Sequence, residues 1–207
     1  MTYAYRTIEG ASTGQYKEKG SRFLSFAFPV ETEESIRTHL EALQKEYFDA
    51  RHHCYAWILG TTQQRFRAND AGEPNHSAGD PILGQIRSRN LTNVLVVVVR
   101  YFGGIKLGVG GLITAYRAAA EDALNKAAIV EREITGSVVI NYTYEATPEV
   151  MRLVRDFKLT ITQQEFQDKC SLTALYSVRI KNDLSGKLEL MQATGTPLEF
   201  HFNTLTL

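Results

Sequence analysis

The sequence predicts an α+β protein of two domains, and three features support that prediction. Residues 94–99 form an unbroken apolar run, almost all β-branched, which is typical of a strand buried on both faces. A glycine-rich segment follows, and from Leu112 the apolar residues recur at helical spacing. Beyond residue 136 the pattern changes to alternating strands and two amphipathic helices. We therefore expect one domain over residues 1–133 and another over 134–207, with the boundary near 131–137.

The composition limits the class of protein. The chain has 207 residues, 43% of them hydrophobic, which is ordinary for a globular protein and excludes a disordered one. The two cysteines, Cys54 and Cys170, are too far apart to indicate a disulfide framework. The first residues lack the blocks of a signal peptide, and no apolar run reaches the roughly 20 residues of a membrane span. We expect a soluble cytoplasmic protein without membrane contact.

The charges balance, so any nucleic-acid surface must be a local patch. Lys plus Arg equals Asp plus Glu, at 23 each. The one local excess lies between Arg65 and Lys106, where six basic residues stand against three acidic ones. The basic residues are Arg65, Arg67, Arg87, Arg89, Arg100 and Lys106.

The first domain is expected to alternate strands and helices. Tyr3–Ile8 is a weak first strand, and three cations in the segment 16–22 precede an apolar strand at residues 23–30. Helices are expected from Glu33, from Pro81, and over residues 112–128, and further strands near His52, at 65–68 and at 94–99. In a strand beginning near His52, His52 and Cys54 share one face and His53 lies on the other. The two histidines therefore cannot ligate one metal ion, and we predict no metal site and no cofactor.

The second domain reads as β-α-β-β-α-β, the order of a ferredoxin-like fold. Alternating strands are expected from Val138, at Leu159–Gln163, at Leu172–Ile180 and near Leu198. Thr147 and Asn182 are expected to be the N-terminal caps of the two helices, with Pro148 at the first helical position of the first. This domain holds no cluster of histidines, cysteines or paired carboxylates, and is interpreted as a binding or docking module.

Two loops of the first domain are candidates for function. The first follows Arg100 and contains five glycines in nine residues, with Lys106 among them: Gly103, Gly104, Gly108, Gly110 and Gly111. Glycines allow a ligand close to the backbone, and the helix that follows offers unpaired N–H groups to an anion. The second loop carries Asp70 and Glu73, which either are plain solvated turn residues, coordinate a ligand, or orient Arg100 or Lys106.

Several of these segments resemble the YigZ/IMPACT family. The matching segments, in the order of the family, are Lys19–Phe23, Asp49–Trp57, Asp70–Pro74 with Ser77–Gly79, Val97–Gly104, and Leu107–Leu112 with Ala115–Tyr116. The resemblance implies a first domain of the type shared by a small-subunit ribosomal protein, elongation factor G and the GHMP kinases, followed by a domain like the last one of elongation factor G. Two departures are Ala71, where the family usually has a second Asp, and His76-Ser77 in place of Gly-Thr, and the first argues further against a cation in this loop.

The resemblance is to a family without an established catalytic activity. It implies a nucleic-acid or ribosome-related role for bacterial members, and a eukaryotic relative restrains a starvation-sensing translation kinase. We predict a non-catalytic binding protein that contacts RNA, the ribosome or a translation-regulatory partner. The predicted ligand- or phosphate-binding residues are Arg22, Arg51, His52, His53, Asp70, Glu73, Arg100, Gly103, Gly104, Lys106, Gly108, Gly110 and Gly111. One alternative is a nucleotide- or phosphate-binding enzyme of GHMP-kinase type, although Leu112-Ile113 replaces the Ser-Ser of those kinases. The other is a protein-interaction adaptor.

Overall fold

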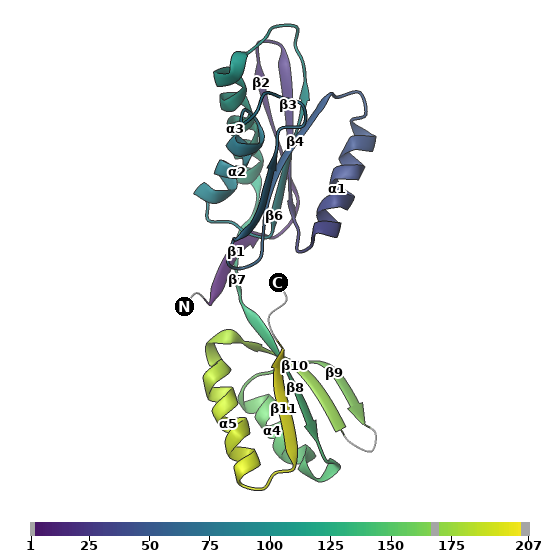
Figure 1. Ribbon diagram of the computed structural model, residues 1–207, viewed down its shortest axis with the longest axis vertical. Coiled ribbons are helices and arrows are strands. Elements are labelled where there is room, and N and C mark those ends of the chain that lie inside the picture. Colours follow the sequence, from purple (N-terminus) through teal and green to yellow (C-terminus); the bar gives the residue numbers. More distant parts are fainter. Residues whose placement is uncertain (1–2, 167–169, 204–207) are drawn as a thin grey trace. The chain divides into compact units, whose positions relative to one another are not determined.

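The computed structural model describes residues 3–166 and 170–203, and these residues form an α+β protein (Figure 1). The chain divides into two compact units. The first comprises residues 5–132, and the second comprises residues 133–203 together with residues 3–4.

The first unit is built on a five-stranded sheet in the order β2-β3-β6-β4-β5, in which all neighbours are antiparallel. Its strands are β2 (Ser12–Glu18), β3 (Ser21–Pro29), β4 (His52–Leu59), β5 (Arg65–Asn69) and β6 (Val94–Tyr101). The central strand is β6, and its residues 94–100 are all buried, as the apolar run predicts. A separate pair of strands, β1 (Ala4–Ile8) and β7 (Ile129–Glu133), accompanies the sheet.

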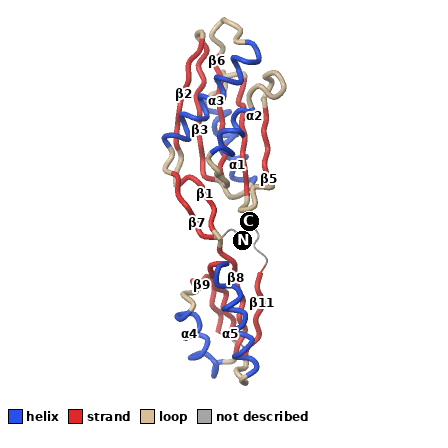
Figure 2. Tube along the Cα trace, turned by 90° about the vertical axis from the view of Figure 1, so that its left-hand side faces the viewer, coloured by secondary structure: helices blue, strands red, loops and turns tan. Residues whose placement is uncertain are grey.

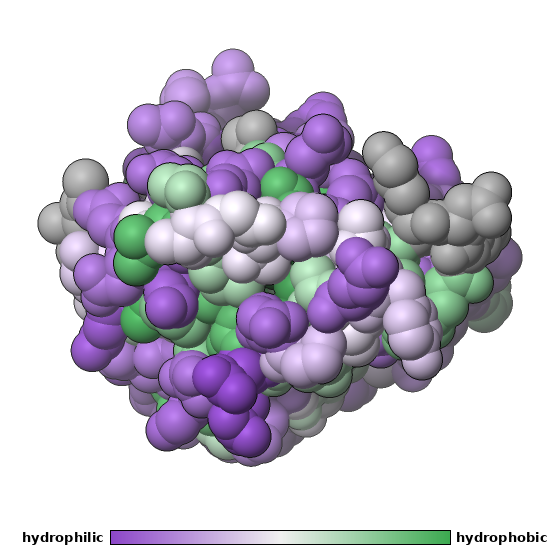
Figure 3. All heavy atoms as spheres, turned by 90° about the horizontal axis from the view of Figure 1, so that it is seen from below, coloured by the Kyte–Doolittle hydropathy of each residue, from purple (hydrophilic) through white to green (hydrophobic). Residues whose placement is uncertain are grey.

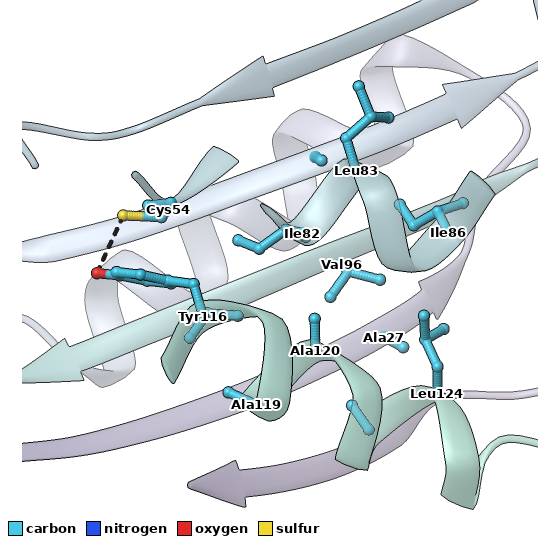
Figure 4. Packing of buried hydrophobic residues seen from close by; sticks show 14 of the residues in the cluster. Ala27, Cys54, Ile82, Leu83, Ile86, Val96, Tyr116, Ala119, Ala120 and Leu124 are labelled. Carbon is cyan, nitrogen blue, oxygen red and sulfur yellow. Dashed lines mark hydrogen bonds between the residues drawn. The ribbon is translucent and has the colours of Figure 1, made fainter. Parts of the chain in front are cut away.

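Helices cover both faces of this sheet (Figure 1). On one face lies α1 (Glu33–Glu46), and on the other lie α2 (Gly79–Ser88) and α3 (Gly108–Lys126). Alternation along β4 directs Cys54 and Ala56 into the core under α2 and α3, and Trp57 into the core under α1. Figure 4 shows how tightly small residues of α3, such as Ala119 and Ala120, pack beside Val96.

Three local features differ from the sequence-based expectation. The segment 12–18 forms the edge strand β2, which was not predicted because its residues are mostly polar. They are polar because only one face of this strand is covered. Residues 129–133 form β7, which was not expected. Helix α3 begins at Gly108 rather than Leu112, so Gly108, Gly110 and Gly111 belong to its first turn and not to the preceding loop.

The second unit has the element order β8-α4-β9-β10-α5-β11. Its elements are β8 (Thr135–Tyr142), α4 (Thr147–Asp156), β9 (Thr160–Phe166), β10 (Cys170–Ser177), α5 (Lys181–Ala193) and β11 (Leu198–Asn203). The four strands form one antiparallel sheet in the order β11-β8-β10-β9. Figure 2 shows β8, β9 and β11 together with α4 and α5. Its core joins alternate strand residues, such as Ile140 and Leu172, to the apolar faces of both helices.

Both helices of the second unit begin differently from the prediction. A 3₁₀ turn precedes each of them, at residues 144–146 and 178–180. Thr147 is therefore the first residue of α4, and its hydroxyl donates to the carbonyl of Tyr144 instead of capping the helix. Strand β10 likewise ends at Ser177, before Val178 and Ile180, because the 3₁₀ turn replaces its expected last residues.

Among the described residues, no helix is long and apolar enough to cross a membrane. On the face drawn in Figure 3, hydrophilic, intermediate and hydrophobic residues are mixed.

Candidate binding site at one end of the five-stranded sheet

Several of the predicted site residues meet at one end of the first unit's sheet. Strand β6 ends there, while β3 and β4 begin there, so that Arg100 of β6 pairs with both Phe23 and His52. The turn between β2 and β3 also reaches this end. A Cβ added to Gly103 would lie 1.9 Å from the carbonyl carbon of Gly20, so the glycine-rich loop lies directly against that turn. We call this end, with residues 19–22, 51–52 and 100–111, the sheet-end surface.

Arg100 is buried at this surface and is held by a carboxylate. Its guanidinium donates to Glu73 Oε1 at 2.6 Å, and the side chains are only 6% and 4% exposed. A second guanidinium nitrogen lies 3.5 Å from the hydroxyl oxygen of Ser21, which also accepts from the backbone N–H of Gly103. Arg100 Nε has no hydrogen-bond partner in the part of the chain that the structure describes. The expectation that Glu73 orients Arg100 therefore agrees with the geometry.

Glu73 also anchors a buried chain of hydrogen bonds. The Tyr116 hydroxyl donates to Glu73 Oε1 at 2.8 Å, and the Cys54 thiol lies 3.3 Å from the same hydroxyl (Figure 4). Burial raises the pKa of the Tyr116 phenol well above its usual range, and burial also raises the pKa of the Cys54 thiol to about 12. Both groups are therefore neutral at physiological pH, and the thiol is a structural group rather than a nucleophile.

The guanidinium of Arg100 is enclosed by two aromatic rings. Its central carbon lies 5.4 Å from the ring centre of Phe23 and 5.6 Å from that of Phe102. Phe23 is fully buried, whereas Phe102 is 56% exposed. Phe102 thus separates the buried cation from solvent and presents a free aromatic surface outside.

Asp70 serves the backbone of its own loop. Its carboxylate accepts hydrogen bonds from the N–H groups of His76, Ala78 and Gly79, the last two at the start of α2. Burial alone would raise the pKa of Asp70, but these N–H groups hold it below its usual value. This set of bonds accounts for Asp70 as a loop and helix-start residue, and the idea that it binds a ligand stays a prediction.

The exposed cations of the sheet-end surface come from three separate segments. Lys19 and Arg22 lie on the β2–β3 turn and the start of β3, Arg51 precedes β4, and Lys106 lies in the glycine-rich loop. All four are exposed, and none forms an ion pair within the described residues. They are therefore available to an anionic ligand.

The basic excess between Arg65 and Lys106 does not form this surface. Arg65 pairs with Glu33, and Arg87 stacks on the ring of Phe66 at 4.3 Å, so both belong to the β5 side of the sheet. Arg100 is buried and paired with Glu73, and its contact with a phosphate stays a prediction. Of the six basic residues, Lys106 alone is an exposed residue of the sheet-end surface.

The two histidines lie on opposite faces of β4, as expected. His52 Nδ1 lies 2.9 Å from the carbonyl of Ala71; because a carbonyl only accepts, this nitrogen carries the proton. His53 faces α1, where burial lowers its pKa and its Nε2 has no partner among the described residues. The structure therefore places His52, but not His53, at the sheet-end surface.

A pocket of ≈390 Å³ opens on this surface. It is lined by residues 49–52, before and at the start of β4, and by residues 100–102, at the end of β6. Asp49 fixes one wall by accepting a hydrogen bond of 2.7 Å from the Tyr101 hydroxyl. Arg22 lies 5.9 Å from the ring centre of Tyr101 and extends the cationic rim.

The five glycines of this segment differ in what requires them. Gly103 is required by packing, because any Cβ there would collide with the β2–β3 turn. Gly104 and Gly108 have φ of +87° and +71°, a backbone region that favours glycine. Gly110 has no atom within 4 Å of a built Cβ, and Gly111 meets only the side chain of Leu107. The open space at Gly110 leaves the backbone of the first turn of α3 accessible.

The first unit also matches a known family. The Impact N-terminal domain matches residues 19–124, which include every segment of the sheet-end surface. The chain belongs to the IMPACT family. Among curated IMPACT family members, that of Haemophilus influenzae is 34% identical over 79% of this chain and 80% of its own length. YvyE of Bacillus subtilis is 28% identical over 96% of this chain and 95% of its own.

A solved structure extends the likeness to both units. A crystal structure described as a hypothetical protein superposes with a TM-score of 0.75 at 26% identity, covering 97% of each chain. An IMPACT relative from rabbit, named Protein IMPACT, is 33% identical over 44% of this chain and 30% of its own length.

Among the described residues no group of three or more His, Cys, Asp or Glu side chains comes together as a metal site would require.

Sequence reasoning missed three members of the site. Ser21, Phe102 and Tyr116 entered the sequence analysis only as parts of the segments that resemble the family. The sequence did carry a signal for Phe102. It is a large apolar residue directly before two glycines, and it continues no alternating pattern of the kind that marks a buried residue in a strand.

Proposed function

We propose that this IMPACT family member is a non-catalytic binding protein that holds single-stranded RNA by its phosphates at the sheet-end surface. The observation that supports this most is that four exposed cations, without ion-pair partners in the described chain, belong to the same surface as the ≈390 Å³ pocket, which Arg51 lines. Phosphate binding needs accessible cations, and their origin in three separate segments gives a track rather than a point.

The buried chemistry favours binding over catalysis. Glu73 is occupied by Arg100 and Tyr116, and Asp70 by three backbone N–H groups. Neither carboxylate is free to act as a general base, which the GHMP-kinase alternative would need. The three glycines at the start of α3, Gly108, Gly110 and Gly111, would instead allow a backbone contact with phosphate.

The rest of the proposal concerns the two folds. The order β-α-β-β-α-β and the strand order of the second unit support a ferredoxin-like domain, which we interpret as a docking module. For the first unit we keep the ribosomal-protein type of domain that the family resemblance implies. A cytoplasmic role in translation or stress regulation, on RNA or the ribosome, follows from these assignments.

The test is the salt dependence of RNA binding. Fluorescence anisotropy with a labelled single-stranded oligonucleotide would compare the wild type with Arg51→Ala/Lys106→Ala across a salt series. Each lost phosphate contact removes about 0.7 from the log–log slope, so we expect the double variant to flatten it by about 1.4. Arg37→Ala, which removes a 69%-exposed arginine of α1, is the control and should leave the slope unchanged.

The opposite outcomes are equally clear. Absence of wild-type binding at low salt, or equal binding by the wild type and the double variant, would refute an RNA site at this surface. Protein partners recovered from nuclease-treated extract, with no RNA bound, would favour the adaptor alternative.

A further inference from the structure

The pocket between the start of β4 and the end of β6 has a composition that phosphate binding alone does not explain. Its volume, ≈390 Å³, lies in the range of about 300–1,000 Å³ that is usual for small-ligand pockets. One of its walls is Phe102, an aromatic side chain left 56% exposed at the mouth. A free phosphate ion needs neither this volume nor an aromatic wall.

The charge around the pocket is nearly balanced. Arg51 and Arg100 line it, but Asp49 also lines it, and Glu73 neutralises Arg100 from behind. An inorganic polyanion would gain little from such a balance, since the excess cations lie on the rim and not inside. The pocket therefore favours a ligand with one phosphate at the rim and an uncharged, flat group inside.

The position of Phe102 suits stacking with such a flat group. The guanidinium of Arg100 lies 5.6 Å from its ring centre and 5.4 Å from the ring centre of the buried Phe23. The Arg100–Glu73 bond of 2.6 Å fixes the cation in place. A ring backed in this way presents a positioned outer surface, and nucleobases stack on aromatic side chains whatever their sequence.

We propose that this pocket takes one unpaired nucleotide of the bound RNA, with its base stacked on Phe102 and its phosphate at Arg51. The inference rests on the proposed function, because it assumes that RNA binds at the sheet-end surface. It adds which form of RNA the site recognises. The pocket requires an unpaired base, so duplex RNA, whose bases are stacked on one another, cannot enter it.

Hydrogen bonds hold two other lining residues of the pocket in place. His52 is held by its bond to the Ala71 carbonyl, and Tyr101 by its bond to Asp49. The site is thus formed before any ligand arrives, and binding need not order these side chains at a cost in affinity.

The experiment compares two side chains of nearly equal exposure in one segment. Phe102 is 56% exposed and Ile105 is 55% exposed. Phe102→Ala should weaken binding of a single-stranded oligonucleotide roughly five- to 150-fold, the equivalent of about 1–3 kcal/mol of stacking per base. Ile105→Ala should leave the affinity within about twofold, and Phe102→Trp should retain wild-type binding.

An abasic oligonucleotide of the same length separates stacking from charge. It keeps the phosphates but has no bases. We therefore expect the wild type and Phe102→Ala to bind it with equal affinity, and the wild type to bind it more weakly than it binds the intact strand. Wild-type binding to RNA that Phe102→Ala does not weaken would overturn the nucleotide pocket while leaving the proposed function in place. Absence of wild-type RNA binding altogether would overturn both.

Discussion

Breaking the buried ion pair should strongly destabilise the first unit. Glu73→Ala would leave the guanidinium of Arg100, 6% exposed, without its carboxylate, and it would remove the acceptor of the buried Tyr116 hydroxyl. Loss of one partner of a buried pair costs about 3–5 kcal/mol. Since domains are stable by only about 5–15 kcal/mol, this is a large share of the total.

An exposed pair of similar length provides the control. Arg65 and Glu33 lie 2.8 Å apart, but their side chains are 52% and 64% exposed. Exposed pairs contribute about 0.2–1 kcal/mol, so Glu33→Ala should have a small effect. The comparison changes the burial of the pair while the type of contact stays the same.

The assay can be restricted to the first unit. Trp57, the single tryptophan of the chain, lies in β4 and is 8% exposed, so its fluorescence reports unfolding of this unit in urea. The double variant Glu73→Leu/Arg100→Met should be less destabilised than Glu73→Ala, because it leaves no unpaired charge. A cost for Glu73→Ala as small as that for Glu33→Ala would refute the reasoning.

Three further predictions concern the loops and the core. Gly103→Ala should destabilise the first unit, because its Cβ would lie 1.9 Å from a backbone carbon. Gly110→Ala should keep or slightly raise stability, and it should weaken RNA binding because the ligand approaches this backbone. Urea unfolding measures the stability of each variant, and fluorescence anisotropy measures its RNA binding. Asp70 has a pKa below its unfolded value of 3.8, so its contribution to stability is complete above that pH and is lost as the pH falls through the folded pKa. Asp70→Ala, which removes the acceptor of three N–H groups, should cost about 0.5–2 kcal/mol at pH 7 and reduce the loss of stability on acidification, as pH-dependent urea curves would test. Both cysteines are buried, and burial raises the pKa of Cys54 to about 12, so a thiol reagent at pH 7 should label neither until urea is added; rapid labelling of the native protein would contradict the structure.

Much of the fold could be predicted from periodicity, because buried elements carry a strong pattern. The run at 94–99 predicted the central strand, and alternation at 52–57 correctly separated the faces of His52 and His53. Strand β2 was missed because it is an edge strand with one covered face, and its polar residues match no strand pattern.

The site was harder to predict, because sequence order does not show which cations are buried. Arg100 directly follows a buried strand, and nothing local distinguishes an arginine that points to solvent from one that meets Glu73, 27 residues earlier. The surface joins Lys19, Arg51 and Lys106, which only the sheet register and the contact at Gly103 bring to one end. Charge counts along the chain could not reveal that arrangement.

Hydrogen exchange with and without a single-stranded oligonucleotide tests the central claim most directly. We predict that bound RNA slows exchange of backbone amides in residues 19–22, 51–52 and 100–111, the segments of the sheet-end surface, and leaves β5 and its neighbour α2 unchanged. Protection confined to the second unit, or to the β5 side with its paired Arg65, would contradict the account and place the RNA elsewhere.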